Sequence, residues 1–203
     1  MKLYEYKAFP SPRRVRIFLA EKKIEIPMEQ VDVPAGENRT PEFLKKNPEG
    51  TVPVLELDNG NYICGTLAIS RYFEEMYPEH PLMGSTAEEK AVIEMWQKRV
   101  EQSLADAVGA YFHHATEGLG ESKRFRNTAW GEKNREVAVN TMKQLNDQLA
   151  DNEFIAGDSF SVADITALCG IDFAQWVKIP MPDSNLNLQR WYTTVSKRQS
   201  VTA

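Results

Sequence analysis

The sequence predicts an α/β domain with a mixed four-stranded sheet, followed by a domain made only of helices. Over residues 1–80, short strand-like and helix-like runs alternate in the order β-α-β-α-β-β-α. A helix between the first two strands predicts that they pair in parallel, and a tight hairpin adds antiparallel strands. Beyond residue 86, apolar residues recur at helical spacing and no strand is needed. We therefore expect an α/β domain over residues 1–79, a linker over 80–86 and a helical domain over 87–203.

Local signals define the elements of the first domain. Pro12 suits the first turn of a helix, where the missing N–H leaves no bond unmade, and Thr40 is a suitable N-cap. The Asn59-Gly60 pair between apolar runs is a strong hairpin signal, and Pro78 ends the last helix. The predicted strands cover residues 2–6, 26–33, 52–57 and 62–64, and the predicted helices cover residues 15–23, 41–46 and 66–77.

The helical domain is predicted from apolar periodicity. Val92, Trp96, Val100, Leu104 and Val108 recur every four residues, which predicts one long amphipathic helix. Further helices are predicted over residues 137–149, 162–176 and 186–195.

The helix expected at residue 162 has a clear start signal. Ser161 and Asp164 have the spacing of a capping box, in which each residue satisfies a backbone N–H of the other. Phe160 and Ile165 stand at the positions of a hydrophobic staple. These residues are therefore interpreted as structural, with a cap contribution of about 1 kcal/mol.

Charge and cysteine content limit the possible functions. The formal net charge of −5 argues against broad nucleic-acid binding through a basic surface. Cys64 and Cys169 are the only two cysteines and form no C-x-x-C pattern, so neither a disulfide framework nor a zinc site is expected. The chain shows no signal-peptide core and no apolar run near the ~20 residues that span a bilayer. We expect a cytoplasmic protein without metal, nucleic acid or membrane partners.

Four stretches together resemble the glutathione S-transferase family. Residues 47–55 (NPEGTVPVL) resemble the loop before the third strand of that family, and residues 66–72 resemble its following helix. Residues 154–164 resemble the capping box of its helical domain, and residues 191–198 resemble its C-terminal part. The resemblance, to cytosolic members of bacterial type, implies a thioredoxin-like first domain that binds glutathione as co-substrate. It also implies a homodimer.

The resemblance also implies a glutathione site in the first domain. In the family the peptide bond before Pro53 is cis, and the backbone of Val52 pairs with the cysteinyl part of glutathione. Thr66 opens a helix whose N-terminus attracts the γ-glutamyl carboxylate, and Asn38 and Arg39 lie where the glycine carboxylate is held. An ordinary loop proline, a plain helix cap and a solvated arginine are the respective alternatives. The implied glutathione-binding residues are Ser11, Asn38, Arg39, Thr51, Val52, Pro53, Gly65 and Thr66.

Gly65 departs from the family pattern, because most members carry Glu or Asp there to hold the γ-glutamyl ammonium. Loss of such a charge-assisted bond weakens binding by roughly 1.5–3 kcal/mol, unless another acid, for example from a partner subunit, replaces it. The departure keeps a second function open, namely a non-catalytic binding or scaffold protein with this fold.

Ser11 is the candidate catalytic residue. A hydroxyl donor near a helix N-terminus, with positive charge nearby, lowers the pKa of a thiol from about 8.5. In some members of the family the catalytic serine aligns nearer Phe9. Other classes use a tyrosine at the end of the first strand, and Tyr6 is the fallback candidate for that role. The alternative for Ser11 is a helix cap. The expected reaction is addition of the glutathione thiolate to small apolar electrophiles, a detoxification chemistry. Glutathione-dependent peroxide or disulfide reduction remains open.

Aromatic residues suggest where the electrophile binds. A pocket between the domains is expected, because aromatic side chains near the helix ends can form an apolar site, although core packing is the alternative for each. His113 and His114 do not suggest a metal site, since adjacent helical residues point about 100° apart and no third ligand is evident. The candidate pocket residues are Phe9, Tyr111, Phe112, His114 and Trp176.

Overall fold

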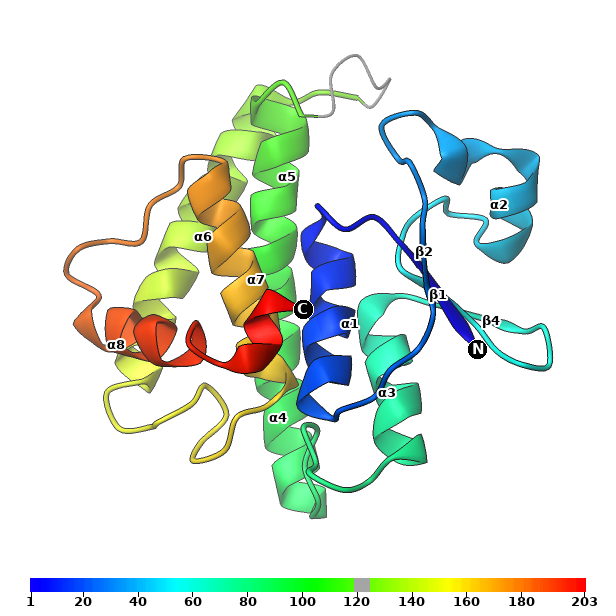
Figure 1. Cartoon of the computed structure of the whole chain (residues 1–203). Helices are drawn as coiled ribbons and strands as arrows, with labels where there is room; N and C mark the ends of the chain where they lie inside the picture. The colour runs from blue at the N-terminus through cyan, green and yellow to red at the C-terminus, as the bar shows by residue number, and fades with distance from the viewer. Residues whose placement is uncertain (119–124) are drawn as a thin grey trace. The chain divides into compact units, whose positions relative to one another are not determined.

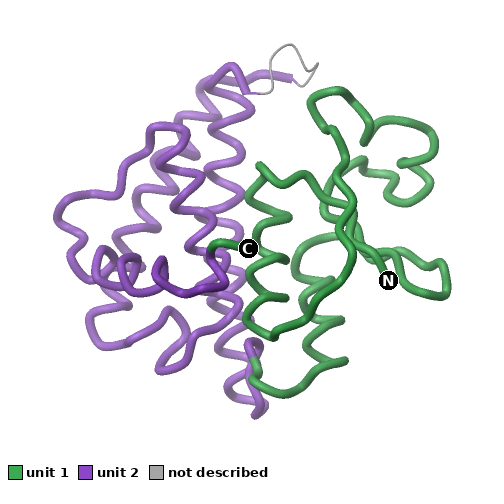
Figure 2. The backbone as a smooth tube through the Cα atoms, viewed as in Figure 1, with its two compact units in different colours: residues 1–81, 202–203 green, residues 82–201 purple. Residues whose placement is uncertain are grey.

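The computed structural model describes residues 1–118 and 125–203 of the chain, which divide into two compact units. Unit 1 comprises residues 1–81 with residues 202–203, and unit 2 comprises residues 82–201 (Figure 2). Among the described residues, no helix combines the length and the apolarity that a membrane crossing requires.

Unit 1 contains the predicted mixed four-stranded sheet, with the strand order β2-β1-β3-β4. The first two strands are parallel, with Leu3 opposite Met28, and β3 runs antiparallel to both β1 and β4. The edge strand β2 is shorter than predicted and its side chains are exposed. The strands are β1 (Lys2–Glu5), β2 (Met28–Gln30), β3 (Val54–Glu56) and β4 (Tyr62–Cys64).

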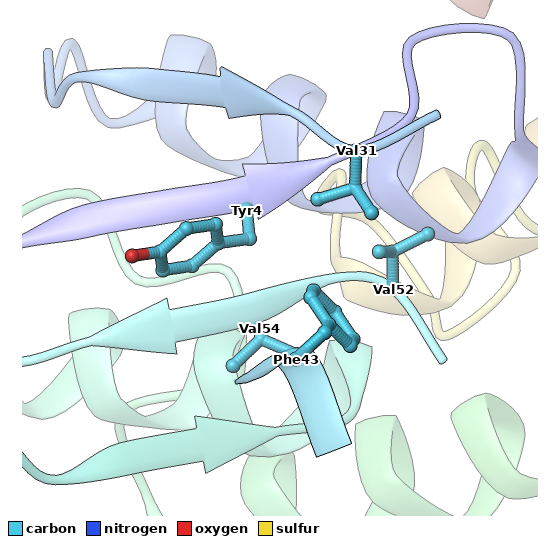
Figure 3. Packing of buried hydrophobic residues seen from close by; sticks show 5 residues of the cluster. All are labelled: Tyr4, Val31, Phe43, Val52 and Val54. Carbon is cyan, nitrogen blue, oxygen red and sulfur yellow. The ribbon is translucent and has the colours of Figure 1, made fainter. Parts of the chain in front are cut away.

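Helices lie on both faces of this sheet (Figure 1). On one face, Phe43 of α2 packs with Tyr4 and Val54, and Val31 and Val52 complete the cluster (Figure 3). On the other face α1 and α3 lie side by side. The helices of unit 1 are α1 (Pro10–Glu21), the 3₁₀ turn η1 (Glu37–Arg39), α2 (Pro41–Lys46) and α3 (Thr66–Met76).

Helix α1 begins five residues earlier than predicted, at Pro10 instead of residue 15. Two prolines fit the first turn because the first N–H groups of a helix have no partner inside it. A buried ion pair between Arg16 of α1 and Glu5 of β1 ties the helix to the sheet, and Gln30 donates to the same carboxylate at 2.7 Å. Removing one partner of such a pair leaves an uncompensated buried charge.

Unit 2 is entirely helical over its described residues. The long predicted helix is present as three consecutive helical segments, α4, the π-helical segment η2 and α5, with no break in the helical backbone between them. Leu104 in η2 is fully buried, and Gly170 allows the close approach of α7, since a Cβ there would lie 3.1 Å from Leu104 Cγ. The elements are α4 (Ala87–Val100), η2 (Glu101–Ala105), α5 (Asp106–Ala115), α6 (Thr128–Gln148), α7 (Val162–Trp176), α8 (Leu186–Val195) and the 3₁₀ turn η3 (Gln199–Thr202), which ends in unit 1.

Two of these helices start at caps that sequence analysis did not single out. Helix α6 begins nine residues before the predicted start, where Asn127 accepts from the N–H of Trp130 at 3.0 Å. Helix α4 begins with a capping box between Thr86 and Glu89, inside the expected linker. Both caps satisfy N–H groups that a helix cannot pair internally.

The predicted capping box at the start of α7 is confirmed and extends further than expected. Asp164 is fully buried and accepts from the N–H of Ser161 at 2.9 Å and from its hydroxyl at 3.0 Å. It also accepts from the N–H of Ile155 at 3.0 Å and from Trp191 Nε1 at 2.8 Å. One carboxylate thus fastens the preceding loop, α7 and α8 together. Burial raises the pKa of Asp164, and the four donors oppose that rise.

Candidate functional site

The loop before β3 is held in a defined shape by Asn47. This asparagine is 2 % exposed and donates to the carbonyl and to the hydroxyl of Thr51, both at 2.9 Å. Its side-chain oxygen accepts from the N–H of Glu49 at 3.1 Å. The Val52–Pro53 peptide bond is cis, as the family resemblance predicts.

Val52 combines a buried side chain with an available backbone. Its side chain belongs to the apolar cluster under α2 (Figure 3). Within the described residues, no hydrogen bond engages its N–H or C=O. An extended peptide can pair with such a segment by adding a strand to the sheet.

Asn38 and Arg39 both contact the same loop. The amide of Asn38 is buried and donates to the carbonyl of Gly50 at 2.6 Å, so its side chain supports the loop. Arg39 is exposed and donates to the carbonyl of Glu49 at 3.0 Å. Glycine is favoured at position 50, because its φ is 60° and a Cβ would lie 2.8 Å from the backbone carbonyl oxygen of Asn38.

The start of α3 lies beside the start of α1. Thr66 is the first residue of α3, and its hydroxyl accepts from Arg14 Nη2 at 3.2 Å and lies 3.4 Å from the carbonyl oxygen of Ser11, to which it donates. The preceding Gly65 has a φ of 89° and provides no side-chain cap, and the first turn of α3 holds no acid. Positive charge and uncapped N–H groups therefore meet at this point, which favours an anion.

The two candidates for the thiol-activating position, Ser11 and Tyr6, lie close together in the sequence. Ser11 lies inside the first turn of α1 and not before the helix as expected, because the N-cap residue is Phe9. Tyr6 follows β1, and its ring packs edge-on against that of Phe9 with 4.8 Å between centroids. Both aromatic residues also pack against the cluster around Val52.

Unit 2 brings two of the candidate pocket residues together. Phe112 of α5 and Trp176 of α7 have ring centroids 5.4 Å apart, and Phe173, which sequence analysis missed, lies 5.5 Å from Phe112 and 6.0 Å from Trp176. The three-residue spacing of 173 and 176 on one helix was the available signal. Phe112 is buried whereas Trp176 is 67 % exposed.

The other three candidate pocket residues, Tyr111, His114 and Phe9, are not part of this group of three rings. Tyr111 and His114 lie half-buried on α5, and His114 Nδ1 is buried with no hydrogen-bond partner among the described residues. Phe9 belongs to unit 1.

The cysteines and acids suggest no redox or metal centre of their own. Cys169 is buried, and Cys64 is half-buried. Burial, with the charge of Glu49, raises the pKa of the Cys64 thiol, which disfavours the reactive thiolate. Over residues 1–118 and 125–203, no three His, Cys, Asp or Glu side chains gather as metal ligands would.

Comparisons with known proteins agree with this architecture. Residues 10–76 match the family model "Glutathione S-transferase, N-terminal domain", and residues 103–199 match "Glutathione S-transferase, C-terminal domain". The chain is 43 % identical to Glutathione S-transferase 2 of Saccharomyces cerevisiae, over 99 % of this chain and 88 % of that protein.

Solved structures of similar proteins extend the match. A glutathione S-transferase domain-containing protein from Marinobacter aquaeolei is 47 % identical with a TM-score of 0.97, over 99 % of this chain and all of that one. Gtt2 from Saccharomyces cerevisiae is 43 % identical with a TM-score of 0.95, over 100 % and 99 % of the two chains. With both family models matched and relatives this similar over nearly their whole length, the chain belongs to the glutathione S-transferase family.

Proposed function

We propose that this glutathione transferase holds glutathione in unit 1 and stabilises its thiolate for attack on small apolar electrophiles. The observation that carries the proposal is the start of α3, where Thr66 contacts both Arg14 and Ser11. A cationic, uncapped helix start receives the anionic end of the tripeptide. The same contact brings a serine of α1 to that end of the site.

The tripeptide would lie along the segment before β3. The N–H and C=O of Val52 pair with its cysteinyl backbone, which is supported by their lack of partners among the described residues. The γ-glutamyl carboxylate reaches Thr66, and the glycine carboxylate reaches Arg39. Asn38, whose buried amide donates to the carbonyl of Gly50, supports the loop on which this site is built.

Ser11 would donate its hydroxyl hydrogen to the sulfur. A hydrogen bond that favours the charged form lowers a pKa, and the first turn of α1 adds the positive end of a helix dipole. We assign the electrophile to the aromatic group of Phe112, Phe173 and Trp176 in unit 2, in which Phe112 is buried and Trp176 is exposed. In this assignment residues 1–79 bind glutathione and residues 87–203 supply the apolar site. The same thiolate is the reductant that peroxide or disulfide reduction requires.

Retention on immobilised glutathione, together with conjugation of an activated chloronitrobenzene, tests the function. We expect retention and turnover, and we expect Thr66→Val to weaken binding roughly tenfold or more, because a bond to a charged group is lost. Thr193→Val, at an exposed position of α8, is the matched control.

The two activities separate the proposed function from its alternative. Retention without turnover would favour a non-catalytic binding protein, the alternative that Gly65 supports. Loss of both in a folded protein would contradict the proposal.

We propose that the protein works in the cytoplasm as a homodimer and detoxifies electrophiles there. Two free thiols and membership of the family support a reducing compartment. Light scattering of the purified chain is expected to give twice the 23.1 kDa mass of one subunit. A mass of one subunit at micromolar concentration would contradict the dimer.

A further inference from the structure

The turn between β1 and α1 is held by side chains from two other elements. The carbonyl of Tyr6 accepts from the N–H of Phe9 at 3.0 Å, which closes a β-turn. Such a turn pairs only its first carbonyl and its last N–H, so the backbone groups of the two central residues need other partners. At Lys7, the first central residue, the N–H donates to Gln30 Oε1 at 2.9 Å and the carbonyl accepts from Arg16 Nη2 at 3.0 Å. The backbone of the turn is therefore clamped from both sides.

Glu5 connects the two arms of this clamp. Its buried carboxylate accepts from Arg16 Nη1 through one oxygen and from Gln30 Nε2, at 2.7 Å, through the other. Arg16 is also buried, and its Nε donates at 3.2 Å to the carbonyl of Ala203, a residue that belongs to unit 1. Each of the three guanidinium nitrogens thus makes a hydrogen bond, which fixes the direction of the Nη2 that reaches Lys7.

Gln30 reaches the turn from the edge of the sheet. It is the last residue of β2, which lies beside β1 (Figure 1), and it is exposed. Its neighbour Glu29 pairs with Lys2 at 2.8 Å instead, since successive side chains of a strand point to opposite faces. Substituting an exposed residue of this kind changes stability little. The contact of Gln30 with the turn can therefore be removed while the core stays packed.

We propose that Gln30 and Arg16 are positioning residues for thiol activation, because their clamp on the backbone of Lys7 fixes the path of the chain into α1 and thereby the place of the Ser11 hydroxyl. The inference rests on the proposed glutathione site, in which that hydroxyl donates to the sulfur. Neither positioning residue needs to touch the tripeptide, since both act through the turn.

The connection from the turn to Ser11 is stiff, so that a shift of the turn moves the hydroxyl. The carbonyl of Phe9, which ends the turn, accepts from the N–H of Arg13 at 3.3 Å and so joins the turn directly to α1. Pro10 and Pro12 stand on either side of Ser11. Each proline fixes its own φ and restricts the residue before it, which leaves little freedom to absorb a displacement.

Gln30→Met in the full chain tests the proposal, because it removes the amide and keeps the length of the side chain. We expect kcat/KM for conjugation to fall on the order of tenfold, within the ~100-fold that a misplacement of 1 Å can cost. The ultraviolet absorbance of the bound thiolate, titrated with pH, should show the pKa of bound glutathione raised toward its free value of about 8.5. Glu29→Met, the same substitution at the neighbouring exposed residue, is the matched control and should change neither quantity.

Two further measurements separate positioning from binding and from folding. Isothermal titration with S-methylglutathione, which has no thiol to ionise, should give a dissociation constant within about twofold of the wild type in Gln30→Met, since its other contacts act independently. Arg16→Lys keeps a positive charge for Glu5 and loses the planar fork that reaches Lys7. It should raise the pKa of the bound thiol as well. The double variant should lose less kcat/KM than the product of the two single losses, because both residues act on one turn.

The contrary outcomes distinguish the inference from the function on which it rests. If the wild type is active, and Gln30→Met changes the unfolding midpoint but neither kcat/KM nor the pKa of the bound thiol, the clamp is purely structural and the inference alone is wrong. Equal losses in Glu29→Met would trace the effect to the edge strand in general and would overturn it too. If the wild type neither binds S-methylglutathione nor turns over glutathione, the proposed function fails and the inference fails with it.

Discussion

Replacing Asp164 with alanine is expected to lower the free energy of unfolding by about 3–5 kcal/mol. The substitution removes the shared acceptor of four buried hydrogen-bond donors. These donors are the N–H and hydroxyl of Ser161, the N–H of Ile155 and Trp191 Nε1. A buried donor without a partner costs about 1–3 kcal/mol, and the four losses are coupled, so they do not simply add. Thermal unfolding followed by circular dichroism should show a midpoint lower by roughly 6–20 °C.

Two further variants make this result interpretable. Asp164→Asn keeps one acceptor oxygen and should lose less stability than the alanine variant. Asp151→Ala removes an exposed acid in the same unit and should change the midpoint by little. A midpoint for Asp164→Ala within 2 °C of the wild type would show that the network contributes little to stability.

Replacing Ser11 with alanine is expected to lower kcat/KM for conjugation by roughly 10- to 150-fold near neutral pH. That range corresponds to losing one hydrogen bond of about 1.5–3 kcal/mol to the developing thiolate. Without the hydroxyl, the pKa of the bound thiol should rise toward its free value of about 8.5. The deficit should therefore shrink as pH rises, since the thiol then ionises unaided. Steady-state kinetics from pH 6 to 9 measure this.

Tyr6→Phe separates the two candidates for this role. If Ser11 stabilises the thiolate, Tyr6→Phe should leave the pH dependence of kcat/KM unchanged. This substitution removes only the tyrosine hydroxyl, and the ring still packs on Phe9. The opposite result would assign thiolate stabilisation to Tyr6: the pH dependence of kcat/KM would then match the wild type in Ser11→Ala and be displaced in Tyr6→Phe.

Helices with local start signals were predictable from the sequence. The helix after the Ser161 cap and the one after Thr40 begin and end where predicted, because a cap and a proline act on their own neighbours. The Thr86 capping box followed the same rule but was missed inside a segment interpreted as a linker. The mixed sheet was also predictable, since it depends on element order and on the Asn59-Gly60 turn.

Contacts between distant residues were not predictable in this way. Arg14 and Thr66 are 52 residues apart, and their contact depends on how α1 and α3 pack against one sheet. The ion pair of Glu5 and Arg16 was missed because each residue looks like an ordinary charge until both are buried. The π-helical segment around Leu104 was also missed, since the apolar spacing continues through it unchanged.

A crystal structure of the chain grown with excess glutathione tests the central claim most directly. The account predicts a tripeptide whose cysteinyl backbone pairs with Val52, whose γ-glutamyl carboxylate lies within hydrogen-bonding distance of Thr66, and whose sulfur faces Ser11. Density for the tripeptide elsewhere, or a segment at Val52 left unoccupied at saturating ligand, would contradict it.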